Sequence, residues 1–194
     1  MTDIQSIIRA SIATKQLILE DENLIARIKE ASEKITLALK NGNKLLFCGN
    51  GGSAADAQHL AAEFSGRFYK DRKALPAEAL HVNTSYLTAV ANDYSFEVVY
   101  SRLVDGIGNE GDVLIGLSTS GNSRNIVNAL ETAEKKKIFT IGLTGASGGE
   151  MKKNCRILLN IPSDDTPRIQ EAHIMIGHII CQLVEEDYFT QDEN

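Results

Sequence analysis

Short apolar runs that end in glycine- or serine-rich turns constrain the fold of this 194-residue chain more than any other feature. The run 45–48 ends in the turn 49–53, which reads Gly-Asn-Gly-Gly-Ser, and an alanine-rich helical segment follows to about Gly66. The run 113–117 ends in the loop 118–123, and a helical segment follows to about Lys136. Strands that alternate with helices over short connections predict an α/β fold, a parallel sheet flanked by helices on both faces.

The remaining segments continue this alternation. Apolar residues at helical spacing predict two N-terminal helices that meet near residues 19–23, and Asn41-Gly42-Asn43 should end the second. Strands are expected at residues 44–48, 79–82, 113–117, 138–143 and 156–161. Helices are expected at residues 85–92, 96–107 and 167–189, with a short one beginning near residue 148. We therefore expect a single domain over residues 1–194, with a helical part (1–43) and a sheet core with a C-terminal helix (44–194).

Composition excludes several classes of partner. A net charge of −6 argues against bulk electrostatic binding to nucleic acid or acidic membranes. The cysteines Cys48, Cys155 and Cys181 are odd in number and lack metal-type spacing, so we expect reduced thiols that pack in the core. The N-terminus has no secretory pattern, and no apolar run approaches membrane-spanning length. These features together predict a cytoplasmic protein.

Two loops carry residues suited to ligand binding, because ligands of parallel sheets bind beyond the carboxyl ends of the strands. The turn 49–53 lacks the third glycine of a dinucleotide fingerprint and the lysine of a nucleotide-triphosphate loop, so it is either a plain turn or an anion site. The loop 118–123 places four hydroxyl side chains within six residues at a strand-to-helix junction. Such neutral donors suit a sugar phosphate, whose charge and hydroxyls both need partners.

A second group of candidates lies on two helices. His59 and Glu63 are four residues apart on one helical face, where they form either a surface contact or part of a site. The surrounding alanines indicate close packing, and a carboxylate there is costly unless it is paired, bound to metal or raised in pKa. Gln170 and His178, eight positions apart on the last helix, could line one side of a cleft. We interpret His81 and His173 as core residues.

These residues together resemble the phosphoheptose isomerases of the sugar isomerase (SIS) superfamily. The resemblance spans nearly the whole chain, and it is carried by residues 48–53, 58–63, 92–93, 118–123, 168–171 and His178. It implies a flavodoxin-like sheet, N-terminal helices used for oligomerisation, and a homotetramer with active sites at subunit interfaces. One departure is that Thr166-Pro167 precedes Arg168, where some members place an aspartate beside the arginine.

The resemblance also implies an activity and its residues. Members of this family convert sedoheptulose 7-phosphate to D-glycero-D-manno-heptose 7-phosphate, the first step toward nucleotide-activated heptose for lipopolysaccharide or capsule. It implies one zinc ion per subunit, held by His59, Glu63, Gln170 and His178. It implies substrate contacts from Asn50, Gly51, Gly52, Asn92, Asp93, Ser118, Thr119, Ser120, Ser123 and Gln170. Isomerisation through an enediol(ate) needs a base at carbon and a proton donor, and we assign these roles to Glu63 and His178.

Two alternatives belong to other functional classes. One relative in the superfamily is a non-catalytic tetramer that binds the replication initiator protein DnaA and lacks residues matching Glu63 and His178. Because this chain keeps both residues, the enzyme is favoured. The other alternative is a regulatory module that senses a sugar phosphate without converting it.

Overall fold

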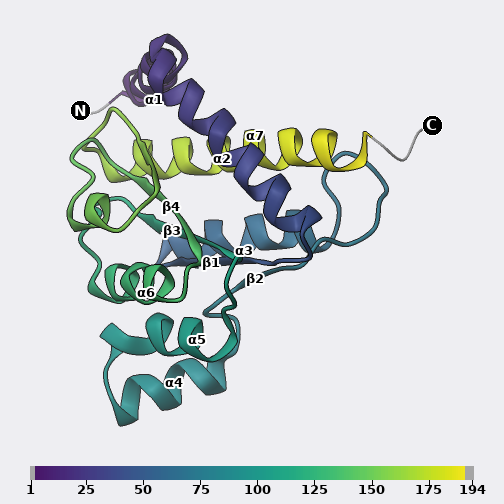
Figure 1. Ribbon diagram of the computed structural model, residues 1–194. Coiled ribbons are helices and arrows are strands. Elements are labelled where there is room, and N and C mark those ends of the chain that lie inside the picture. Colours follow the sequence, from purple (N-terminus) through teal and green to yellow (C-terminus); the bar gives the residue numbers. More distant parts are fainter. Residues whose placement is uncertain (1–2, 191–194) are drawn as a thin grey trace.

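The computed structural model describes residues 3–190, so residues 1–2 and 191–194 of the expected domain lie outside the described residues. Parallel strands form one sheet in the order β2-β1-β3-β4-β5 (Figure 1). The strands are β1 (Leu45–Gly49), β2 (Ala77–Ala79), β3 (Val113–Ser118), β4 (Phe139–Thr144) and β5 (Ile157–Asn160). The helices are α1 (Ile4–Glu20), α2 (Glu22–Lys40), α3 (Gly52–Ser65), α4 (Thr84–Asp93), η1 (Phe96–Val98), α5 (Val99–Ile107), α6 (Arg124–Lys135), η2 (Glu150–Lys153) and α7 (Thr166–Phe189). This strand order confirms the predicted flavodoxin-like α/β fold.

Helices cover both faces of the sheet because successive strand side chains point to opposite sides. Leu45 and Phe47 of β1 pack in one core cluster with residues of α2, α3 and α7. Leu46 and Cys48 pack in a second cluster with residues of α5 and α6. Figure 1 shows α7 and α3 on one side of the sheet, and α6, α5 and α4 on the other. Every residue of β1 and β3 is consequently buried, which explains why both read as continuous apolar runs.

The order of the strands in the sheet reverses at β1, because β2 lies on one side of it and β3 on the other. From β1 the chain passes through α3 to β2 on one side, and it later returns to β3 on the other side of β1. The turn after β1 and the loop after β3 therefore leave the sheet as neighbours. Such a reversal opens a crevice beyond the carboxyl ends of the two strands, where open α/β sheets bind ligands.

Most predicted elements agree with the structure within about two residues, but the strand expected at residues 79–82 was wrong. The observed β2 is shorter and ends at Ala79. The backbone then turns at residues 80–81, where the Val82 amide donates to the Ala79 carbonyl, and the Asn83 side chain caps α4 by accepting from the Tyr86 amide. The helix expected at residues 96–107 begins with the 3-10 turn η1 and becomes α-helical only at Val99.

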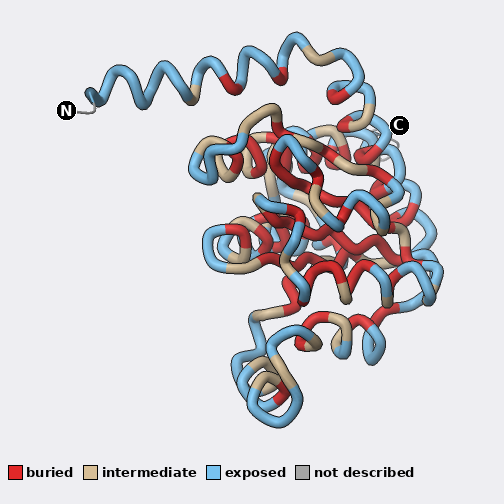
Figure 2. Tube along the Cα trace, turned by 90° about the vertical axis from the view of Figure 1, so that its left-hand side faces the viewer, coloured by how far each residue is buried: buried red, intermediate tan, exposed pale blue. Residues whose placement is uncertain are grey.

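Helix α1 projects from the body of the protein, and most of its residues are exposed (Figure 2). Ile4, Ile8 and Ile12 are 74%, 54% and 60% exposed. The helix is attached to α7, where the Arg168 guanidinium donates to the Ile7 carbonyl at 2.9 Å. A projecting helix with an exposed apolar face is typical of an interface between subunits.

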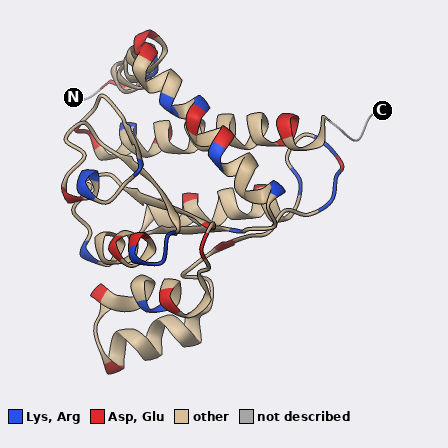
Figure 3. Ribbon diagram, in the orientation of Figure 1, with Lys and Arg blue, Asp and Glu red and all other residues tan. Residues whose placement is uncertain are grey.

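Charges are mixed over the described surface, with Lys and Arg interspersed among Asp and Glu on helices and loops (Figure 3). In residues 3–190, no helix has both the length and the apolar character needed to cross a membrane. Cys48 and Cys181 are buried and Cys155 is partly buried, all as free thiols, which confirms their predicted core packing. Burial raises the pKa of Cys155 and Cys181 to about 12.

Candidate active site

The turn after β1 is joined to the first turn of α6, which follows the loop 118–123, by a reciprocal pair of side-chain hydrogen bonds. Asn50 and Asn125 each donate from their amide nitrogen to the other's oxygen at 2.9 Å. Gly51 adopts a φ of 56°, which favours glycine, and this conformation lets α3 begin at Gly52 directly after the strand. The structure thus brings the two predicted ligand loops together at the carboxyl edge of the sheet.

The loop 118–123 gathers its hydroxyl groups at the start of α6. The Ser118 and Ser123 hydroxyls lie 3.0 Å apart, and the Ser120 hydroxyl accepts from the Asn122 amide at 3.1 Å. Ser123 is the residue that precedes α6, so the loop lies against the positive end of that helix. Amides and hydroxyls that converge at a helix N-terminus suit a phosphate group.

A cluster of possible metal ligands lies between α3 and α7. The His59 Nε2 atom contacts the Glu63 Oε1 atom at 2.9 Å, and the His59 and His178 ring centroids are 5.1 Å apart. One ligand atom from each of His59, Glu63 and His178 lies within 4.8 Å of the other two. Three of the four ligands implied by the resemblance therefore meet in one subunit.

The chemistry of this cluster fits a zinc ion. Two imidazoles and a carboxylate form a donor set that zinc binds readily. The His178 Nε2 atom is buried, and it has no hydrogen-bond partner among the described residues. A buried polar atom without a partner costs free energy, which a bound cation would offset.

Asp56 also faces this cluster, although sequence reasoning missed it. Burial raises the pKa of the Asp56 carboxyl above its usual value, while the nearby His59 and His178 act to lower it. Its Oδ2 atom is buried, and no partner for it occurs within residues 3–190. The available signal was its spacing, because a residue three positions before His59 lies on the same helical face. His173 is fully buried in the core, as predicted.

Gln170 lies at the other end of the same pair of helices, against the start of α3. A Cβ added to Gly52 would lie 2.7 Å from the Gln170 Nε2 atom and 2.8 Å from its Oε1 atom. The missing side chain of Gly52 therefore makes room for the Gln170 amide. Gln170 thus lies beside a predicted substrate loop, and its role as a fourth metal ligand stays a prediction.

Asn92 and Asp93 end α4, where both are exposed and the Asn92 amide donates to the Asp93 carboxylate at 2.9 Å. The sheet and α5 separate α4 from α3 and α7 (Figure 1). One subunit therefore does not bring this predicted substrate pair to the His59–Glu63–His178 cluster.

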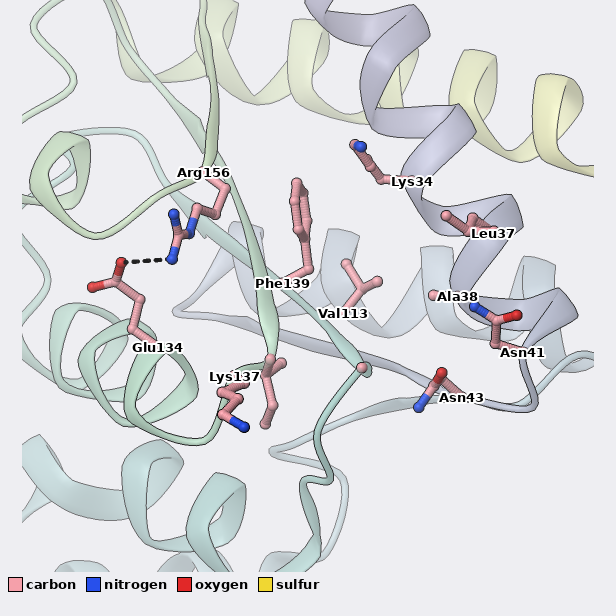
Figure 4. Close-up of a pocket in the computed structure, with 12 residues that line it drawn as sticks. Lys34, Leu37, Ala38, Asn41, Asn43, Val113, Glu134, Lys137, Phe139 and Arg156 are labelled. Atoms are coloured by element: carbon pink, nitrogen blue, oxygen red, sulfur yellow. Dashed lines mark ion pairs between the residues drawn. The ribbon is translucent and has the colours of Figure 1, made fainter.

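Two pockets contrast in their position relative to this cluster. A pocket of about 440 Å³ adjoins it and is lined by His178 together with Phe68 and Tyr69. A pocket of about 490 Å³ lies instead at the amino ends of the strands (Figure 4). Two of its cations already have partners: Arg156 pairs with Glu134, and Lys137 pairs with a glutamate outside the pocket lining. Only the first pocket belongs to the candidate site.

Comparisons with known proteins agree with this geometry. Residues 10–145 match the family model described as the SIS domain. The chain is 58% identical over 179 residues to phosphoheptose isomerase 2 of Campylobacter jejuni, covering 92% of this chain and 89% of that protein. It is 54% identical over 186 residues to phosphoheptose isomerase of Aneurinibacillus thermoaerophilus, covering 96% and 94%. The solved structure of the phosphoheptose isomerase GmhA from Neisseria gonorrhoeae superposes with a TM-score of 0.89 at 41% identity, covering 94% of this chain and 97% of that one.

Proposed function

We propose that this chain, which belongs to the phosphoheptose isomerases of the SIS domain family, converts sedoheptulose 7-phosphate to D-glycero-D-manno-heptose 7-phosphate. It is an aldose–ketose isomerase. The observation that carries the proposal is the meeting of His59, Glu63 and His178 beside a pocket of about 440 Å³. Sequence similarity identifies the family. The carboxylate and the imidazoles of the cluster are groups of the kind that proton transfer between carbons requires.

The reaction moves a proton between adjacent carbons through an enediol(ate). In our proposal Glu63 removes the proton from C1 of the ketose and returns one to C2, because a carboxylate is the basic group of the cluster. As the enediol forms, His178 donates a proton to the C2 oxygen, and as C2 is protonated it takes the proton of the C1 hydroxyl, so both residues return to their starting states. The partly enclosed position of both side chains limits competition from water. His59 holds the Glu63 carboxylate in place through its 2.9 Å contact.

Substrate binding is assigned to the two loops at the carboxyl edge. Ser118, Thr119, Ser120 and Ser123 would hold the phosphate at the start of α6. Asn50, Gly51, Gly52 and Gln170 would contact the sugar hydroxyls. The Asn50–Asn125 pair supports this assignment, because it fixes the turn after β1 relative to the start of α6, where the loop 118–123 ends.

We propose zinc as the bound metal, held by His59, Glu63, His178 and Gln170. When bound, the ion would supply Lewis-acid stabilisation of developing negative charge on the sugar oxygens. The two nitrogens and the carboxylate of the cluster support this choice over magnesium or calcium, which prefer oxygen ligands.

We also propose a cytoplasmic homotetramer whose active sites lie at subunit interfaces. The exposed apolar face of α1 supports this, as does an apolar pocket of about 620 Å³ between α1, α2 and α7. The separation of Asn92 and Asp93 from the cluster gives a second reason, because a neighbouring subunit could supply the pair. The product would enter synthesis of nucleotide-activated heptose. The DnaA-binding and sensor alternatives are not favoured, because the chain keeps both Glu63 and His178.

The substitution Glu63→Gln tests the assignment of the base. Glutamine keeps the shape of the side chain but accepts no proton, so kcat should fall by about 10²- to 10⁴-fold in an assay with sedoheptulose 7-phosphate. Glu110→Gln is the matched control, because Glu110 forms an exposed ion pair with Lys137 at the amino ends of the strands, away from the candidate site. Near-wild-type turnover of Glu63→Gln, with both variants folded, would remove the assignment.

A further inference from the structure

A buried carboxylate on α7 holds the loop between α3 and β2. Residues 66–76 of this loop contain no helix or strand and carry several Lys and Arg residues (Figure 3). The Glu185 carboxylate nevertheless accepts from three consecutive backbone amides, those of Phe68 at 3.3 Å, Tyr69 at 2.8 Å and Lys70 at 2.9 Å. Consecutive amides that converge on one anion fix the backbone of all the residues that donate them.

Arg72 links this carboxylate to the end of α3. Its Nε atom donates to the Glu185 carboxylate at 2.7 Å, and its Nη2 atom donates to the Glu63 carbonyl at 2.8 Å. Its Nη1 atom also donates to the Phe64 carbonyl at 2.9 Å. One guanidinium thereby satisfies carbonyls that the last turn of a helix leaves without partners. Arg72 therefore fixes the backbone of the residue that we assign as the base.

The loop held by Glu185 forms a wall of the site. The Phe68 ring lies 5.6 Å from the His178 ring, and Phe68 and Tyr69 stack edge to face at 4.6 Å between centroids. All three residues line the pocket of about 440 Å³. The position of Phe68 against His178 thus depends on a backbone that Glu185 holds.

The burial of this ion pair is what singles it out. The side chains of Arg72 and Glu185 are only 4% and 3% exposed. Burying two charges is costly, and well-packed apolar residues stabilise a fold at least as well. The protein has another largely buried pair, Lys44 with Asp112, which joins the residues that precede β1 and β3. That pair gives a control for the effect of a buried ion pair on stability alone.

We propose that Glu185 and Arg72 are positioning residues for the isomerase: they orient Phe68 and His178 through the loop, and Glu63 through the end of α3. The proposal rests on the proposed function for its kinetic consequences. The orientation of His178 is a separate consequence that does not depend on turnover.

The substitution Glu185→Gln tests the proposal. Glutamine keeps the size of the side chain but loses the charge and presents donors to the loop amides, so the loop should shift. We expect kcat to fall by about 10- to 100-fold, as is usual for partners that orient active-site ligands, while KM changes less. Asp112→Asn removes a comparably buried carboxylate, and its kcat should stay within about twofold of wild type at a temperature where both variants are folded.

An NMR readout separates positioning from activity. The chain contains four histidines, so their ring signals are few enough to assign. Glu185→Gln should shift the His178 ring signals, whereas Asp112→Asn should leave them in place. Arg72→Lys, which keeps a cation beside Glu185 but loses the donors to the Glu63 and Phe64 carbonyls, should also shift the His178 signals and supplies the test if Glu185→Gln does not fold.

The outcomes are distinct. Unmoved His178 signals in Glu185→Gln, with kcat close to that of Asp112→Asn, would overturn the proposal. If Glu185→Gln does not fold, unmoved His178 signals and wild-type kcat in Arg72→Lys would overturn it. A wild-type protein without isomerase activity whose His178 signals still move in Glu185→Gln would refute the proposed function and leave the positioning role standing.

Discussion

Replacing Gly52 with alanine would place one methyl group where the Gln170 amide now lies. The new Cβ would be 2.7 Å from the Gln170 Nε2 atom, whereas ordinary contacts begin near 3.4 Å. The amide must therefore withdraw by about 0.7 Å. Displacements of about 1 Å in a binding group can cost about 10²-fold in rate, so kcat/KM should fall by about 10- to 100-fold.

The stability of this variant should not fall. Gly52 has no positive φ and begins α3, where alanine is favoured over glycine by up to about 1 kcal/mol. Only the flexible end of the Gln170 side chain must move. Gly106→Ala in α5 is a matched control, because nothing lies within 4 Å of its added Cβ.

Kinetics with sedoheptulose 7-phosphate and thermal unfolding, measured on both variants, test this reasoning. We expect Gly52→Ala to lose activity at an unchanged or higher Tm, and Gly106→Ala to keep its activity. Wild-type kcat/KM in Gly52→Ala would refute the placement of Gln170 in the site. A large fall in Tm would refute the argument that only the side chain yields.

Stability should fall as the pH drops from 6.5 toward 4, because burial lowers the pKa of His173 to about 4 and its Nε2 atom faces the Thr144 carbonyl. The unfolded chain takes up a proton that the folded chain does not bind until near pH 4, which removes about 3 kcal/mol. Urea unfolding at about pH 7 and about pH 4.5 should show a smaller loss for His173→Gln, and equal losses would contradict this. Asn125→Ala should raise KM more than it lowers kcat, because it leaves Asn50 without its partner; steady-state kinetics with an unchanged KM would argue against that role.

The sequence predicted the sheet well because the signals for its elements are local. Apolar runs, glycine turns and helical periodicity each lie within a few residues, and together they determined the parallel topology. The strand at residues 79–82 was misplaced because an apolar run continues past Ala79. The chain turns within that run, at residues 80–81, before Asn83 caps α4.

The candidate site was predicted less completely, because its partners are distant in sequence. His59, Glu63 and His178 were predicted, and the structure brings them together. Glu185 was missed, because its partner Arg72 is 113 positions away and no local pattern marks a buried charge.

The central claim is that the Glu63 cluster moves a proton between carbons of a heptose phosphate. The most direct measurement is NMR of purified protein incubated with sedoheptulose 7-phosphate in D₂O, with and without a chelator. We predict an aldose product that carries solvent deuterium at C2, with less product after chelation and product formation about 10²- to 10⁴-fold slower in Glu63→Gln. Wild-type protein that gives neither product nor deuterium exchange at carbon would contradict the account.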